Sequence, residues 1–279
     1  GSWSTLRSFI GWGKQRYPAE RYAVIVWNHG NGWRERVPEA VSYDDDLGTK
    51  ISTWDLAKAF PFRVDLLAFD ASLMQQMEVA YELRNSARVI VGSEESPPGA
   101  GYPYHRVLAR FRDFPSAATP SLAKAFVDAM LAEPDYRLEK ITQSVLDAEQ
   151  IGPLASKLHL LAQRVHALRN VMGPTLAKAR ASAQPYSDNG LRQYRDLIGV
   201  LDVLAVDSPR SDIRGLAADA REQARRTILS NGRNSRSPKS NGLSIEFANA
   251  GLFAPAAANY RRLGFARDTA WDEMLAAQK

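Results

Sequence analysis

Three short apolar runs in the first half of the chain constrain its fold more than any other feature. They span residues 22–27 (YAVIVW), 64–69 (VDLLAF) and 88–92 (RVIVG). A largely continuous apolar run of this length is typical of a strand that is buried on both faces of a sheet. Helical patterns at residues 53–60 and from about 73 to 85 separate the runs. Strands that alternate with helices at this spacing indicate parallel pairing, with helices covering both faces of the sheet.

The second half of the chain is predicted to be mostly helical. Apolar residues keep a three-four spacing over residues 154–171, which indicates the buried face of a packed helix. Residues 184–190 and 230–241 are rich in Gly, Ser and Asn and are predicted to be loops. The alternating run GLSIEF at residues 242–247 predicts a late strand. We expect it to join the main sheet, because a lone strand cannot satisfy its backbone groups.

Length and composition fit one large α/β domain. The chain has 279 residues, of which 45% are hydrophobic and 24% charged, as in ordinary globular proteins. We expect residues 3–115 to form an α/β core and residues 116–279 to form a helical region, with a strand and helix that complete the same domain. No run of 18 apolar residues occurs, so no membrane partner is expected. The opening Gly-Ser resembles a tag remnant, and no signal segment follows it, which leaves the location open between secreted and cytoplasmic.

The charge and the cysteine content argue against nucleic-acid binding, disulfide bonds and thiolate metal sites. The net charge of +5 is small, and the densest basic stretch, residues 221–239, lacks interleaved aromatic residues. A solvated helix end and loop therefore explains this stretch better than a phosphate-binding patch, and no nucleic acid partner is expected. The chain contains no cysteine, which excludes disulfides and thiolate metal sites.

The ends of two predicted strands carry residues that suit acyl transfer. The first run ends just before His29 and Gly30, and the second ends just before Asp70 and Ser72. Because the carboxyl ends of parallel strands meet at one edge of a sheet, we expect His29 and Ser72 to face one crevice. The glycine leaves a backbone N–H open to an oxyanion, and Ser72 would stand at the start of the helix that follows. A nucleophile, a proton-transfer group and backbone donors would then surround one carbonyl.

Several ordered motifs extend this pattern along the chain. They read WNHGNGW at 27–33, FDASLM at 69–74 ahead of EVAY at 78–81, GSEE at 92–95, PGAGYPY at 98–104 and GLSI at 242–245. In this order the motifs resemble those of clostripain-family cysteine peptidases, which belong to the caspase-like clan. The likeness covers nearly the whole chain, from Leu6 to Leu275. It implies a caspase-like α/β/α sandwich with a mostly parallel sheet, plus a helical C-terminal half.

The resemblance implies roles for three residues in catalysis. His29 would be the catalytic histidine, Ser72 occupies the place of the nucleophilic cysteine, and Gly30 with the Ser72 backbone N–H would form the oxyanion hole. A serine hydroxyl without a strong base is a far poorer nucleophile than a thiolate. The resemblance thus implies a cysteine endopeptidase that Ser72 makes inactive, through a deliberate Cys-to-Ser substitution. The alternative is a natural pseudoprotease that binds peptides or a partner protein.

The resemblance also implies a specificity for basic residues. Asp70 matches the acidic residue at the base of the S1 pocket, where a carboxylate would pair with an arginine or lysine at P1. Glu94 and Glu95 could line the same pocket or merely cap a strand. Relatives often carry a further acid in the turn where this chain has Ala100. We therefore expect cleavage after Arg or Lys, with Asp70 holding P1 mostly by itself.

Two further expectations concern ions and partner segments. Asp44, Asp45 and Asp46 could form a calcium turn, although their spacing lacks the EF-hand pattern and favours a solvated acidic turn. No other metal or cofactor is expected.

Relatives begin with a strand, a helix and another strand ahead of the segment matching residues 6–13. The resemblance therefore implies a missing N-terminal segment or a second chain that completes the sheet. Arg34, Arg36 and Lys50 follow His29 and have the P1 chemistry that a processing site would need.

Overall fold

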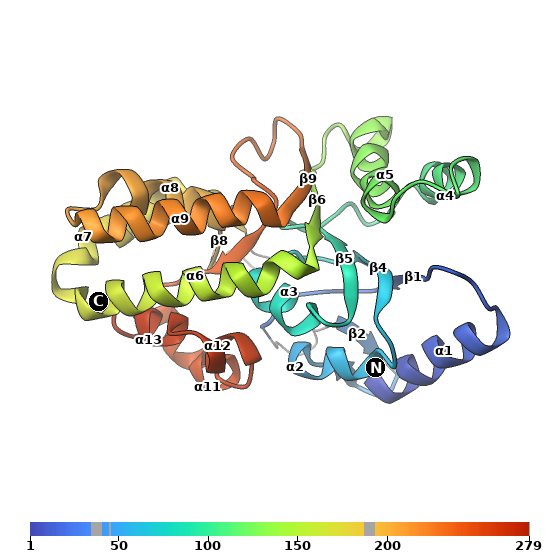
Figure 1. Cartoon of the computed structure of the whole chain (residues 1–279), viewed down its shortest axis with the longest axis horizontal. Coiled ribbons are helices and arrows are strands. Elements are labelled where there is room, and N and C mark those ends of the chain that lie inside the picture. The colour runs from blue at the N-terminus through green and yellow to red at the C-terminus, as the bar shows by residue number, and fades with distance from the viewer. Residues whose placement is uncertain (35–40, 45, 187–192, 279) are drawn as a thin grey trace.

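A five-stranded sheet forms the centre of the molecule (Figure 1). In this computed structural model, residues 1–34, 41–44, 46–186 and 193–278 are described. The strand order is β1-β4-β5-β6-β9, and these strands span Ala23–Trp27, Val64–Asp70, Ala87–Gly92, Thr142–Asp147 and Ile228–Arg233. β1, β4 and β5 pair in parallel, whereas β6 is antiparallel to both of its neighbours. Since β6 alone runs against the others, the sheet is mixed but mostly parallel, as predicted.

Helices cover both faces of this sheet. α1 (Trp3–Arg16), α3 (Met77–Leu83) and α6 (Ala148–Ala167) lie on one face, and α4 (Tyr104–Asp113) and α5 (Thr119–Ala132) on the other (Figure 1). Successive strand residues point to opposite faces, so the sheet contributes to two hydrophobic cores. One core contains Leu67, Phe69 and Ile90, and the other contains Leu66, Ala68, Val89 and Val91. The α/β/α sandwich is therefore confirmed.

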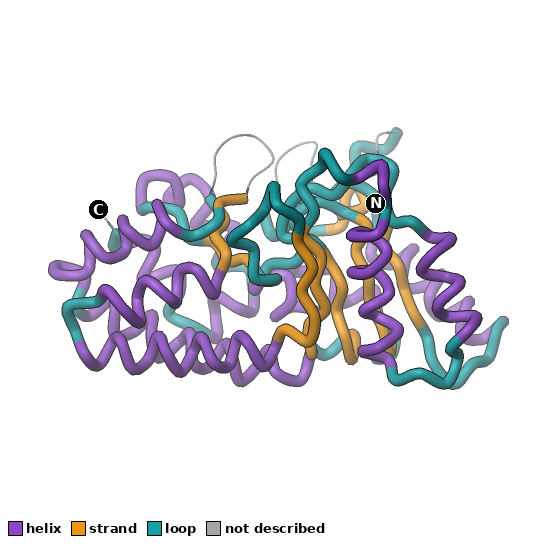
Figure 2. The backbone as a smooth tube through the Cα atoms, turned by 90° about the horizontal axis from the view of Figure 1, so that it is seen from above, coloured by secondary structure: helices purple, strands orange, loops and turns teal. Residues whose placement is uncertain are grey.

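A helical extension continues beyond the edge of the sheet, as Figures 1 and 2 show. α7 (Arg169–Ser182), α8 (Leu197–Asp207) and α9 (Ser211–Thr227) pack together with α6. The prediction of one helix over residues 154–171 is wrong at its end. The chain turns at Leu168, whose N–H bonds to the carbonyls of both Arg164 and Val165, and a new helix begins at the next residue.

Shorter elements complete the fold. They are α2 (Thr53–Leu56), a 3-10 turn (Ala57–Ala59), the hairpin of β2 (Val41–Asp44) and β3 (Thr49–Ile51), and α10 to α13 (Ala250–Phe253, Ala257–Tyr260, Gly264–Asp268, Trp271–Ala276). The helix expected at residues 53–60 is thus present as α2 and the 3-10 turn. In the part of the chain that the structure describes, no helix is long and apolar enough to cross a bilayer.

The late strand lies elsewhere than expected. β10 (Ser244–Glu246) pairs with β8 (Tyr194–Asp196) in a small antiparallel sheet that also contains β7 (Pro185–Tyr186), so its assignment to the main sheet is wrong. The backbone of β10 needs no partner in the main sheet. β8 pairs with it on one side, and the Gln75 carbonyl accepts the Ser244 N–H at 3.0 Å. The loop expected over residues 230–241 is also partly wrong, since residues 230–233 belong to β9.

Candidate active site

The pairing of β1 with β4 brings two predicted site residues into one cleft. Trp27 lies opposite Asp70 in parallel register, and the Asn28 N–H donates to the Asp70 carbonyl at 3.3 Å. The residues that follow the two strands therefore emerge at the same edge of the sheet. His29 and Ser72 both line a cleft of about 320 Å³ there. Its other walls are Trp27, Asn28, Tyr43, Asp70, Ala71, Pro97, Pro98, Gly99 and Gly101.

Gly30 lets the histidine loop lie directly against the serine. A Cβ atom at Gly30 would come within 2.6 Å of the Ser72 carbonyl oxygen and 3.0 Å of the Ala71 Cβ. Real Cβ atoms do not approach a backbone oxygen so closely, so only glycine allows this contact. The close approach places the backbone next to His29 beside residue 72.

The loop that carries His29 is fastened to its surroundings through Asn28. The Asn28 Oδ1 accepts hydrogen bonds from the N–H of His29 at 2.7 Å and from the N–H of Tyr43 at 3.1 Å. The Asn28 Nδ2 donates to the Tyr43 carbonyl at 3.3 Å. These bonds tie the loop to β2 and leave the His29 side chain exposed at the cleft.

Ser72 stands on an irregular turn and not at a helix start. α3 begins at Met77, so the expected helix from about residue 73 is wrong, and so is the dipole argument that rested on it. Leu73 is fully buried and has φ +62°, a left-handed conformation that costs a bulky residue about 1–2 kcal/mol. The turn is held by the residue that follows β5, because the Ser93 carbonyl accepts the Gln75 N–H at 3.1 Å. This sharp turn leaves Ser72 half-buried in the cleft, two residues after the end of β4.

Asp70 lies buried at the floor of the cleft. It is 4% exposed, and its Oδ2 accepts hydrogen bonds from the Tyr102 N–H at 3.0 Å and the Tyr104 hydroxyl at 2.8 Å. A Cβ at Gly101, which has φ +74°, would lie 2.5 Å from that oxygen. Burial, reinforced by the bond to Asp70, raises the pKa of Tyr104, which therefore remains a donor at neutral pH. The sequence offered no role for Tyr104, although it closes the PGAGYPY motif.

The structure does not bring Glu94 and Glu95 to the cleft lining. Glu94 Oε2 accepts the Gly242 N–H at 2.8 Å, and burial followed by the charge of Asp196 raises the pKa of Glu94 well above its usual value. Glu95 Oε2 pairs with Lys140 Nζ at 3.3 Å. Both carboxylates, which follow the end of β5, therefore bind other parts of this chain and do not line the cleft.

The acidic turn shows local contacts. Asp44 Oδ1 accepts the Leu47 N–H at 3.0 Å, and Asp45 lies outside the described residues. Among the described residues, no three His, Asp or Glu side chains gather as ligands for a metal ion. Calcium binding stays a prediction.

An α/β/α sandwich with a mostly parallel sheet, and with His29 and Ser72 at the ends of neighbouring parallel strands, matches the caspase-like fold of C11 cysteine peptidases. Within this class, the chain belongs to the clostripain family, whose family model matches residues 1–216.

One curated relative is clostripain from Hathewaya histolytica, which is 34% identical over 129 residues. That match covers 40% of this chain and spans about a quarter (24%) of the relative's length.

Solved structures share the fold. An inactive zymogen C11 protease from Parabacteroides distasonis matches with a TM-score of 0.69 and 20% identity, over 96% of this chain and 75% of that one. A secreted C11 cysteine protease from Bacteroides thetaiotaomicron, in complex with an irreversible peptide inhibitor, has the same TM-score at 19% identity, over 96% and 78% of the two chains. A clostripain from Bacteroides thetaiotaomicron ATCC 29148, in complex with the peptide inhibitor BTN-VLTK-AOMK, matches at 0.58 and 18% identity, over 79% and 95%.

Proposed function

We propose that the chain is the catalytic domain of a cysteine endopeptidase that cleaves after Arg or Lys, and that Ser72 makes it inactive. The observation that carries the proposal is the shared cleft, which holds His29, Ser72 and the buried carboxylate of Asp70. A nucleophile position, a titratable ring and a buried counter-charge around one cavity are what hydrolysis of a basic peptide requires. Family membership supports the reaction class.

With cysteine at position 72, the reaction would follow the acyl-enzyme route. The cysteine transfers its proton to His29, and the resulting thiolate attacks the scissile carbonyl carbon. The backbone N–H groups of Gly30 and residue 72 stabilise the oxyanion. His29 donates a proton to the leaving amine, and the C–N bond breaks to give a thioester. Water then attacks the thioester, with His29 accepting its proton, and releases the new carboxylate and the free thiol.

In this chain the first step lacks a competent nucleophile. The Ser72 hydroxyl must lose its proton as it attacks, which requires a histidine pressed closely against it by hydrogen bonding. The His29 side chain is instead exposed, and the hydrogen bonds of its loop hold the backbone through Asn28. We therefore assign the inactivity to residue 72 and not to the rest of the cleft.

The P1 preference follows from the way Asp70 is bound. Both hydrogen bonds from the tyrosines go to Oδ2. Within the described residues Oδ1 receives no hydrogen bond, so it is the oxygen that would meet an arginine or lysine side chain. The peptide part of the inhibitor on one relative, VLTK, ends in lysine, which supports a basic P1 residue.

A natural pseudoprotease that binds peptides through the same cleft is the second candidate, and the serine at position 72 favours it. Restoring cysteine separates the two. The Ser72→Cys protein should hydrolyse arginyl and lysyl amide reporters, whereas the parent should not. A folded Ser72→Cys protein that stays inert on both reporters, with any completing segment supplied, would support the binding module.

A further strand beside β1 belongs to the same proposal. Among the described residues β1 has a partner strand on one side only, and grooves flank it on both faces. One groove, of about 390 Å³, lies between β1 and α1, and the other, of about 320 Å³, is lined by Phe111 and Leu122. Open sheet edges are normally covered or paired in natural proteins. We propose that an N-terminal segment or a second chain adds a strand there.

A further inference from the structure

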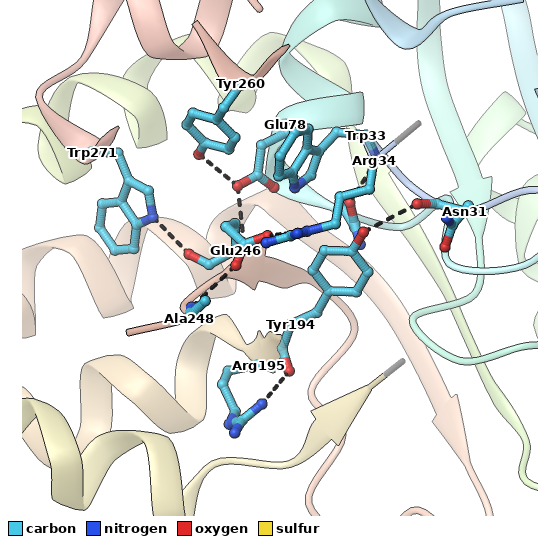
Figure 3. Close-up of polar contacts among 11 residues, drawn as sticks. Asn31, Trp33, Arg34, Glu78, Tyr194, Arg195, Glu246, Ala248, Tyr260 and Trp271 are labelled. Atoms are coloured by element: carbon cyan, nitrogen blue, oxygen red, sulfur yellow. Dashed lines mark hydrogen bonds and ion pairs between the residues drawn. The ribbon is translucent and has the colours of Figure 1, made fainter. Parts of the chain in front are cut away.

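A network of buried charged groups lies behind the loop that carries His29, and the proposed chemistry does not use it. The side chain of Arg34 is 12% exposed, and its Nε donates to Glu246 Oε2 at 2.9 Å. The Glu246 side chain is fully buried. Glu78, from α3, is also fully buried, and its Oε1 accepts hydrogen bonds from the Tyr260 hydroxyl at 2.8 Å and from the Glu246 N–H at 3.0 Å. Figure 3 shows Arg34 reaching from the loop towards both carboxylates.

The charges of this network favour the pairing of the Arg34 guanidinium with Glu246. The charge of Glu246 raises the pKa of Arg34 in spite of its burial. Burial, with a smaller contribution from Glu246, raises the pKa of Glu78 to about 7, so this acid is largely protonated in mildly acidic solution. Burial also raises the pKa of Glu246, and its ion pair with Arg34 opposes that rise. Among the described residues, Glu246 is the carboxylate that pairs directly with the guanidinium. If the loop moved away, it would leave Glu246 buried without its counter-charge, which is strongly unfavourable.

Three other hydrogen bonds fasten the same stretch of loop. They are Tyr194 Oη to the Asn31 carbonyl at 3.1 Å, Thr53 Oγ1 to the Gly32 carbonyl at 3.0 Å, and Trp33 N–H to Gln76 Oε1 at 3.1 Å. Trp33 is 1% exposed and packs edge-on against Tyr260, with ring centroids 4.7 Å apart. Residues from α2, β8, β10 and α11, together with Gln76 just before α3, therefore converge on four consecutive loop residues.

We propose that Arg34 and Glu246 are positioning residues, which hold the loop from Asn28 to Arg34 so that the His29 ring stays beside residue 72. This inference rests on the proposed peptidase function. His29 lies on irregular backbone, so no helix or strand of its own fixes it. Displacement of a catalytic group by about 1 Å can lower a rate by about 100-fold. A buried ion pair contributes little net stability to the fold. Any loop position that separates the two charges is nevertheless unfavourable, because a buried charge then lacks its partner.

The same contact bears on processing. Arg34 has P1 chemistry, but its side chain is committed to Glu246 and its backbone lies next to the buried Trp33. A protease needs an extended and accessible segment with a free P1 side chain. The Arg34 side chain would therefore have to leave Glu246 before it could enter an S1 pocket, and processing after Arg34 stays a prediction. Arg36, a neighbouring candidate, lies outside the described residues.

The kinetic test uses the Ser72→Cys protein as its parent. The double variant Arg34→Met/Glu246→Gln removes both charges and roughly keeps the volume, and Arg34→Lys keeps the charge. We expect the double variant to lower kcat on an arginyl reporter by on the order of tenfold or more, with KM changed by less than about twofold. Arg34→Lys should recover part of the loss.

Arg221→Met is the matched control. Arg221 pairs with Asp202 at 2.9 Å, is 26% exposed, and has a buried Nε without a hydrogen-bond partner among the described residues, as Arg34 has a buried Nη2. It joins α9 to α8, away from the loop. The kcat of the Arg221→Met variant should equal that of the Ser72→Cys parent. The assay temperature is one at which thermal unfolding shows every variant to be folded. A double variant with parental kcat would overturn the inference.

A second readout is independent of activity. The chain has four histidines, so the ring resonances of His29 can be assigned with a His29→Gln variant. In the Ser72 protein, the double variant should shift or broaden the His29 signals and leave those of the other histidines in place. Unchanged His29 signals would also overturn the inference. An inert Ser72→Cys protein whose His29 signals respond as expected would instead refute the proposed function and retain the positioning role.

Discussion

At the scale of single residues, Asp70 carries the substrate preference in the proposed mechanism. In the Ser72→Cys background, Asp70→Asn should lower kcat/KM on a P1 arginine reporter by more than about 100-fold, because the cation would enter a pocket without its counter-charge. The measurement compares matched P1 arginine, lysine, leucine and aspartate reporters, and the fold is checked by thermal unfolding.

Tyr104→Phe is the matched control for Asp70. It removes one hydrogen bond to Oδ2 and leaves the carboxylate in place. We expect a loss of about tenfold or less, since the charge that attracts P1 remains. Equal rates on leucine and arginine in the parent, or an Asp70→Asn variant with parental kcat/KM, would remove Asp70 from the pocket.

The sequence predicted the location of those candidate residues whose position depends on the direction of two parallel strands. His29, Gly30 and Ser72 follow β1 and β4, and Asp70 is the last residue of β4. Parallel pairing of those strands brings their carboxyl ends to one edge. It did not predict where Glu94 points. That depends on Gly242, 148 positions further along the chain, whose N–H binds the carboxylate.

At the scale of elements, β1 gives a prediction about the sheet edge. Its outward backbone N–H groups should exchange with solvent faster than the amides of β4, which has strands on both sides. An added N-terminal segment or second chain that pairs with β1 should slow this exchange, and residue-resolved hydrogen exchange would measure the change. Outward β1 amides that are already as protected as those of β4 would contradict an open edge.

The elements that the sequence missed have identifiable physical reasons. β6 begins Thr142, Gln143 and Ser144, which read as polar surface but are fully buried. The Gln143 amide donates to the Tyr102 hydroxyl at 2.8 Å, so tertiary hydrogen bonds replace apolar packing. β9 is the opposite edge strand and is mostly not buried, so it has no apolar run. The strands found from sequence are those with continuous apolar runs.

At the scale of the whole molecule, the buried acid Glu78 links stability to pH. Its pKa rises from 4.5 to about 7 on folding, so the folded state holds a proton that the unfolded chain has lost. The contribution of Glu78 to the free energy of unfolding is therefore greatest below about pH 4.5. It falls by on the order of 3 kcal/mol as the pH rises to about 7. Above that range it is constant.

Urea unfolding of the parent and of Glu78→Gln at several pH values between 5 and 8 measures this contribution. The variant cannot titrate at this position, so the free energy of unfolding of the parent should fall relative to that of the variant as the pH rises. Curves that remain parallel would show that Glu78 has an ordinary pKa. The comparison cancels buried acids that do not interact with Glu78, such as Glu94, which both proteins share.

Covalent labelling tests most directly whether the single residue Ser72 silences an otherwise competent peptidase cleft. The Ser72→Cys protein is incubated with a peptidyl acyloxymethyl ketone that ends in arginine, and the intact mass is measured. We predict one adduct per chain at residue 72, none in the Ser72 parent, and little when His29→Ala is added to Ser72→Cys. An unlabelled Ser72→Cys protein, or labelling that does not depend on His29, would contradict the claim.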